Sequence, residues 1–126
     1  MKGVIVSLFI AAALIAGSIA YTNHIDNVSQ QLGKINGQIM QSLENGDFDS
    51  AGDGIKRLGE YLDKNRTVLA ATGNHEEFDK IEMNISELTA YTDGMHQTDA
   101  ISSCRVLSFL FEHLPKNYEI KLENIL

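Results

Sequence analysis

The sequence predicts an all-α fold in which an N-terminal transmembrane helix precedes antiparallel helical hairpins, arranged as a four-helix up-down bundle or a tetratricopeptide-like array. Two observations predict this fold. After residue 23, apolar residues recur every three or four positions in four separate stretches, which is the period of amphipathic helices. Before them lies an apolar run without charges. The chain has 126 residues, so about 100 remain for one small domain beyond that run.

The N-terminal apolar run extends from Val4 to Tyr21, which is eighteen residues (21 − 4 + 1). Eighteen residues at the helical rise are just long enough to cross the hydrocarbon of a bilayer. Lys2 precedes the run, so the positive-inside rule predicts a cytoplasmic N-terminus. We therefore expect residues 1–22 to be a signal anchor and residues 23–126 to be an extracytoplasmic domain of a single-pass protein in the cell membrane.

The same run leaves two alternatives open. Ser18 and Ala20 have the spacing that a signal peptidase accepts, so cleavage after Ala20 would give a secreted protein. Ala13 and Gly17 form a small-xxx-small pattern that could pack two copies into a homodimer. Alanine-rich signal sequences show this pattern by default.

The charge balance excludes nucleic acid as a partner. Of the 10 basic residues only Lys2 precedes Asn23, so the remainder has 9 basic and 17 acidic residues, a net charge of 9 − 17 = −8. Affinity for phosphate backbones requires clustered Lys and Arg. The single cysteine, Cys104, cannot form an intramolecular disulfide, and we interpret it as a buried small apolar residue rather than a reactive thiol.

Four amphipathic helices are expected beyond the apolar run. Their apolar positions are Ile25, Val28, Leu32, Ile35, Ile39 and Leu43; Ala51, Ile55, Leu58 and Leu62; Phe78, Ile81, Ile85 and Leu88; and Cys104, Leu107, Phe111 and Leu114. Val106, Phe109 and Leu110 make the fourth helix apolar nearly all round, so we expect it to be the most buried. Pro115 should end it, with the tail YEIKLENIL extended across the bundle.

The two hairpins repeat each other at an offset of 49 residues (100 − 51). Ala51 and Ala100 each follow a turn that contains a glycine and an aspartate. Under the same shift Leu32 corresponds to Ile81, and Leu58 to Leu107. We therefore expect both turns to have the same structure, with a small alanine where the returning helix makes its first close contact.

The aspartate-rich first turn also resembles a calcium-binding loop. Counted from Asp49, Gly54 takes position six and Glu60 position twelve of an EF-hand. Ala51, however, stands at position three, where an oxygen ligand is required. We therefore interpret the stretch as a turn and a helix start, capped by Asp47 or Asp49.

Antiparallel hairpins would bring several polar side chains to their open end. His75 and His113 are each nineteen residues from Gly94 (94 − 75 and 113 − 94). The residues that could form a metal- or pH-sensing cluster there are His24, His75, Glu76, Asp79, Glu112 and His113. No two of these histidines have the i, i+4 spacing of a helical metal motif, so capping of helix ends is the preferred interpretation, and we expect no metal and no cofactor.

Motifs for catalysis are not found in the sequence. It contains no HExxH, no glycine-rich phosphate loop and no serine or cysteine in a nucleophile motif. We therefore expect a non-enzymatic module that binds another protein, most simply another component of the cell envelope.

Several segments resemble a known family. They are the N-terminal anchor, ENGDFDSA, HEEFDKIEMNISEL and the ending LSFLFEHLPKNYEIKLENIL, and they resemble the Gram-positive bacterial family named domain of unknown function 4363. Members look like single-pass proteins with a Leu-Leu-Glu-His-Ile-Pro segment and a closing Leu-Glu-Asn-Ile. The corresponding residues here are Leu110, Phe111, Glu112, His113, Leu114 and Pro115, then Leu122, Glu123, Asn124 and Ile125. Phe111 and Leu114 differ from the pattern but keep it apolar. The resemblance implies an architecture but no reaction.

Overall fold

The protein is a bundle of helices. The computed structural model describes residues 1–70 and 75–125, with side chains at 1–70 and 75–115. Its elements are α1 (Lys2–Glu44), α2 (Phe48–Lys64), α3 (Arg66–Ala70), α4 (His75–Asp93) and α5 (Gln97–Ile125). The predicted all-α fold is confirmed, and the short helix α3 is an element that the apolar periodicity did not predict.

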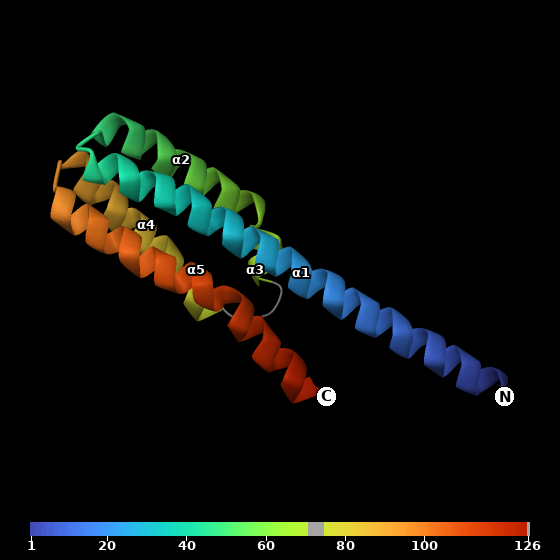
Figure 1. Cartoon of the computed structure of the whole chain (residues 1–126). Coiled ribbons are helices and arrows are strands. Elements are labelled where there is room, and N and C mark those ends of the chain that lie inside the picture. The colour runs from blue at the N-terminus through green and yellow to red at the C-terminus, as the bar shows by residue number, and fades with distance from the viewer. Residues whose placement is uncertain (71–74, 126) are drawn as a thin grey trace.

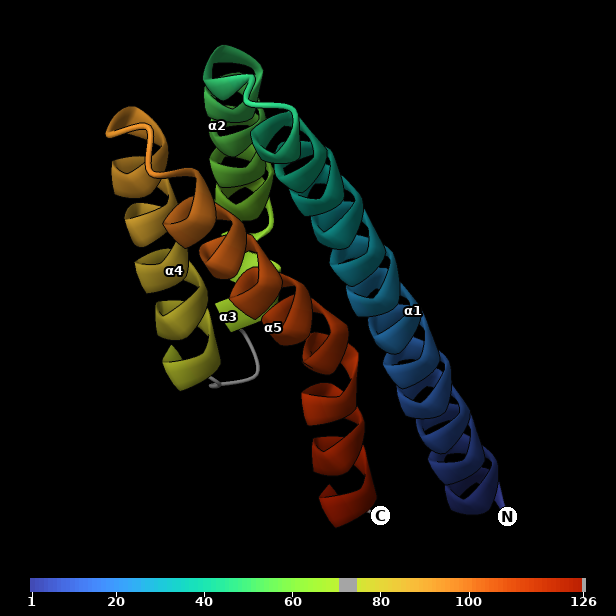
Figure 2. The ribbon, with the colours of Figure 1, turned by 60° about the vertical axis from the view of Figure 1, so that its left-hand side comes forward.

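The four long helices form a closed ring. α1 packs against α2 and α5, and α4 packs against α5 and α2, so each long helix has two antiparallel neighbours. The α1–α2 and α4–α5 turns both lie at the end of the bundle far from the N-terminus (Figure 2). Of the two architectures expected, the structure is therefore the up-down bundle.

The interior is built from the predicted apolar stripes. Every stripe position is buried except Ile85, which is partly buried. Burial begins near Tyr21, whose hydroxyl donates a 2.8 Å hydrogen bond to the Val68 carbonyl oxygen of α3. The helix before that point projects from the bundle (Figure 1), and its 18-residue apolar window is not buried against the rest of the protein. α1 is thus long and apolar enough to span a membrane, and it runs without a break through the expected domain boundary at residue 22.

The two turns have the same backbone hydrogen bonds, shifted by 49 residues. In the first turn, the N–H groups of Asn45, Gly46 and Asp47 donate to the carbonyl oxygens of Gln41, Leu43 and Ser42, in that order. In the second turn, the N–H groups of Gly94, Met95 and His96 donate to the carbonyl oxygens of Ala90, Thr92 and Tyr91, in that order. Each turn has a left-handed residue that ends the helix in the manner of a Schellman motif, namely Gly46 with φ 72° and Met95 with φ 58°. The predicted equivalence of the hairpins is therefore present at the level of single hydrogen bonds.

The aspartate-rich turn is a helix start, as predicted. The Asp47 carboxylate accepts hydrogen bonds from the Ser50 N–H at 3.1 Å and the Ser50 hydroxyl at 2.8 Å. These bonds lower the pKa of Asp47, since they favour its charged form. Asp49, Asp53 and Glu60 all lie on the continuous helix α2, so they do not form a calcium loop.

Arg66 joins α2 to α4. Its guanidinium pairs with Asp63 at the end of α2, at 2.9 Å, and with Glu82 on α4. It also lies 4.9 Å from the centre of the Phe78 ring. Arg66 is the first residue of α3, so these contacts hold the start of α3 against α4.

Hydrogen bonds from side chains fix α1 against α5 at three levels. The Gln97 amide donates to the Leu43 carbonyl at 2.6 Å, the Asn36 amide donates to the Cys104 carbonyl at 2.8 Å, and the Ser29 hydroxyl donates to the Phe111 carbonyl. The α1 positions are 43, 36 and 29, and their α5 partners are 97, 104 and 111. A step of seven down one helix therefore matches a step of seven up the other, which sets an antiparallel register.

Pro115 does not end α5, contrary to the prediction. The helix continues to Ile125, so the tail is not extended, and Figure 2 shows that α5 changes direction in its C-terminal part. Proline lacks an N–H, which leaves the Phe111 carbonyl four residues earlier without its helical donor. Ser29 of α1 supplies that donor instead. A neighbouring helix thus satisfies the backbone group that the proline would leave unpaired.

Cys104 lies in the core, as predicted. Its side chain is fully buried, and burial raises the pKa of the thiol to about 12. At neutral pH the group is therefore protonated and poorly nucleophilic.

The link between Ser29 and Pro115 predicts non-additive mutations. We expect Ser29→Ala to destabilise the bundle by about 1–3 kcal/mol, because it leaves the buried Phe111 carbonyl unsatisfied. In a Pro115→Ala background, where the substituted residue restores the helical N–H, the same change should cost about 1 kcal/mol less. Thermal unfolding of the four proteins in detergent micelles measures this coupling. Equal costs of Ser29→Ala in both backgrounds would contradict it.

The two left-handed residues predict opposite effects of substitution. Met95→Gly should raise the stability by about 1 kcal/mol, since its side chain is 70% exposed and glycine adopts a positive φ without strain. Gly46→Ala at the equivalent position should lower it by about the same amount. Melting curves of the two variants provide the comparison, and a destabilised Met95→Gly protein would show that the turn depends on the methionine side chain.

The burial of Cys104 predicts a thiol that is protected in the folded state. At pH 8, a water-soluble aromatic disulfide reagent should modify the native protein about a hundredfold or more slowly than the protein in denaturant. Absorbance at the wavelength of the released thiolate follows the reaction. Similar rates in the two states would mean that α5 opens readily.

Candidate interaction site

The residues of the suggested metal- or pH-sensing cluster lie on three helices. His24 is exposed on α1, His75, Glu76 and Asp79 are exposed on the first turns of α4, and Glu112 and His113 lie on α5. Among the described side chains, no three His, Cys, Asp or Glu residues lie close enough together to hold a metal ion.

His113 interacts within its own helix. Its Nδ1 atom lies 2.8 Å from the Phe109 carbonyl oxygen, and its ring stacks on the Phe109 ring with 4.0 Å between centroids. Because α5 continues past it, His113 does not cap a helix end. Both described contacts of His113 are thus with Phe109, one turn earlier on the same helix.

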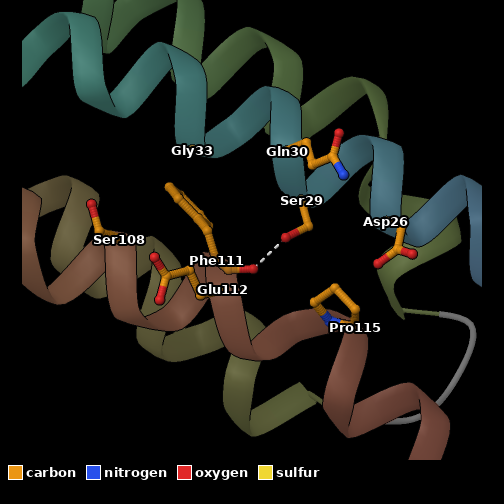
Figure 3. Close-up of a pocket in the computed structure, with 8 residues that line it drawn as sticks. All are labelled: Asp26, Ser29, Gln30, Gly33, Ser108, Phe111, Glu112 and Pro115. Atoms are coloured by element: carbon orange, nitrogen blue, oxygen red, sulfur yellow. Dashed lines mark hydrogen bonds between the residues drawn. The ribbon is translucent and has the colours of Figure 1, made fainter.

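A groove of about 400 Å³ runs between α1 and α5 beside the buried hydrogen bonds. Figure 3 shows its lining, which is Asp26, Ser29, Gln30 and Gly33 from α1 and Ser108, Phe111, Glu112 and Pro115 from α5. The dashed line in the same view is the Ser29–Phe111 hydrogen bond at its floor. Ser108 is also fixed, because its hydroxyl oxygen accepts a 2.8 Å hydrogen bond from the Asn36 amide. The groove is therefore shaped by the same contacts that hold the two helices together.

The outer face of α5 carries apolar side chains in contact with solvent. Leu110 is buried as expected, but Val106 is 45% exposed and Phe109 is 59% exposed. α5 was expected to be the most buried helix because it is apolar nearly all round, but the ring of helices leaves one side of α5 without a neighbour, and these two side chains lie there. We call Val106, Phe109 and the stacked His113 the α5 outer face.

The sequence contains one signal for the α5 outer face, which was interpreted above as a sign of burial. A helix that is apolar nearly all round has more apolar positions than its two neighbours in the ring can cover. Nothing local signals the groove, since it depends on the register between segments about 80 residues apart in the chain. Among their described side chains, neither site presents a set of metal ligands, and both are surfaces that a second molecule could contact.

Comparison with known proteins assigns the chain to a family. No curated protein and no solved structure matches it. Residues 19–125, which include all of the bundle, match the family described as a domain of unknown function (DUF4363). The match covers more than half of the chain, and it agrees with the resemblance of the C-terminal segment. The protein belongs to the DUF4363 family.

Proposed function

We propose that this protein is a membrane-anchored, extracytoplasmic helical module that binds another envelope protein through the α5 outer face. The observation that carries the proposal is the exposure of Phe109, a large aromatic side chain held by stacking on His113. Exposed aromatic residues with restricted motion are typical anchors of protein interfaces. The role assigned to the domain is binding, without a catalytic step.

The anchor supports the same role. The apolar segment of α1 projects from the bundle and none of it is buried. A single-pass span of this kind would hold the bundle at a membrane and raise its local concentration beside other membrane proteins. Lys2 before the span supports a location of the bundle outside the cell. The proposal also includes that the chain is not cleaved after Ala20, so that the span stays attached to the bundle. We do not propose the metal- or pH-sensing alternative, because no observation of the described residues favours it.

Site-specific crosslinking tests the role of the α5 outer face. A photoreactive phenylalanine analogue at position 109, expressed in native membranes, should give one adduct of defined mass. The matched control is the same analogue at Met83, which is 62% exposed on α4 and thus equally accessible. We expect the adduct at 109 alone, since the proposed partner covers α5 and not α4.

A charge substitution completes this test. Phe109→Asp should abolish co-purification of the partner found by crosslinking and leave the melting temperature nearly unchanged, because the ring is exposed. Equal adducts at positions 83 and 109, or a partner that is retained by Phe109→Asp, would contradict the proposal. A partner of the same mass as the chain itself would identify a homodimer.

A further inference from the structure

Among the described residues that line the groove between α1 and α5, both helices supply a negative charge and neither supplies a positive one. Asp26 comes from α1 and Glu112 from α5 (Figure 3), and neither forms an ion pair with a described side chain. A second hollow of about 310 Å³ between α1 and α2 differs, since Arg57 and Lys64 line it together with Glu60. Of these two hollows, only the α1–α5 groove has an unbalanced acidic lining.

The rim of the groove on the α1 side is open. A Cβ atom added to Gly33 would meet no atom within 4 Å, and the same holds for Gly37 one turn further. A glycine inside a helix costs about 1 kcal/mol relative to alanine. Neither glycine has a positive φ or a close neighbour in this chain that would require it. The open rim allows a second molecule to approach α1 closely.

The floor of the groove combines apolar and polar groups. Phe111 and Pro115 supply apolar surface, and the Ser108 hydroxyl oxygen, which accepts one hydrogen bond from Asn36, has a second lone pair that can accept from a ligand. A lysine or arginine side chain fits this combination. Its methylene groups can lie against Phe111 and Pro115 while its charged end reaches the carboxylates at the rim.

We propose that the α1–α5 groove binds a basic segment of a partner protein, with a Lys or Arg side chain between Asp26 and Glu112. This inference rests on the proposed function, because it names the chemistry of the partner of an interaction module. The net charge of −7 supports it, since an acidic protein attracts a basic segment and repels a second copy of itself.

Peptide binding to the full-length protein in uncharged detergent micelles tests the inference. The probe is a fluorescein-labelled helical peptide of Ala and Arg, and its counterpart has Glu in place of Arg. Fluorescence anisotropy should show binding of the Arg peptide alone, weakened when the salt concentration rises from about 0.05 to 0.5 M. The double variant Asp26→Asn, Glu112→Gln should weaken binding by about tenfold or more.

Two control proteins distinguish the groove from bulk charge. Asp53→Asn, Glu87→Gln makes the same change in net charge at exposed positions on α2 and α4, and it should alter the affinity by less than about twofold. Gly33→Leu fills the open rim without changing the charge, and it should also weaken binding by about tenfold. Equal losses in the two charge variants, or full binding by Gly33→Leu, would overturn the inference.

The peptide-binding test of the groove can fail without contradicting the proposed function, which the crosslinking at position 109 tests. If the Arg peptide does not bind but the crosslink at position 109 persists, the basic partner is excluded and the interaction module stands. If chromatography shows a dimer of this chain that the Asp26→Asn, Glu112→Gln protein lacks, the groove is an interface between two copies, and the inference fails.

Discussion

The pairing of the first long helix with the last one is the constraint on which the rest of the structure depends. Both hairpins can form from local contacts, but the ring closes only when α1 meets α5. Three side chains at seven-residue intervals set this pairing by donating to backbone carbonyls on the other helix. One of them, Asn36, is fully buried, and its Oδ1 atom has no partner among the described residues. A buried amide of this kind favours one register at a cost in stability, as a polar residue does in a coiled-coil seam.

The same pairing explains why a proline is tolerated inside α5. An unpaired Phe111 carbonyl would cost free energy in this buried position. Because the Ser29 hydroxyl donates to this carbonyl, α5 can contain Pro115 and bend without that cost. The bend in turn shapes the groove, because Pro115 and Phe111 line it beside Ser29. The bend in α5 and the candidate binding site therefore share one of the three hydrogen bonds that set the pairing, and it joins residues 82 positions apart.

Sequence reasoning succeeded where local rules decide the structure. The apolar stripes identified the core, Asp47 was one of the two predicted caps, and the 49-residue offset predicted two turns of the same structure. It failed where a distant segment overrides a local rule. Pro115 ends a helix in isolation, but Ser29 compensates for it here. The helix α3 has only five residues, too few to show an apolar period. The exposure of Phe109 follows from which side of α5 lacks a neighbour, and that is a property of the assembled ring.

Because α1 is one continuous helix, the distance of the groove from the apolar segment is fixed, and this distance limits which partners can reach the groove. A flexible linker after Tyr21 would let the bundle turn freely, whereas an unbroken helix fixes its height above the apolar segment. Asp26 lies five residues beyond Tyr21 (26 − 21) and Gly33 twelve (33 − 21), which corresponds to about 7.5 and 18 Å along the helix axis. With residues 4–21 in a membrane, the groove opens just above the bilayer surface. A soluble protein that approaches from far above the membrane meets the turns first, so the groove favours a partner whose binding segment lies beside its own membrane span.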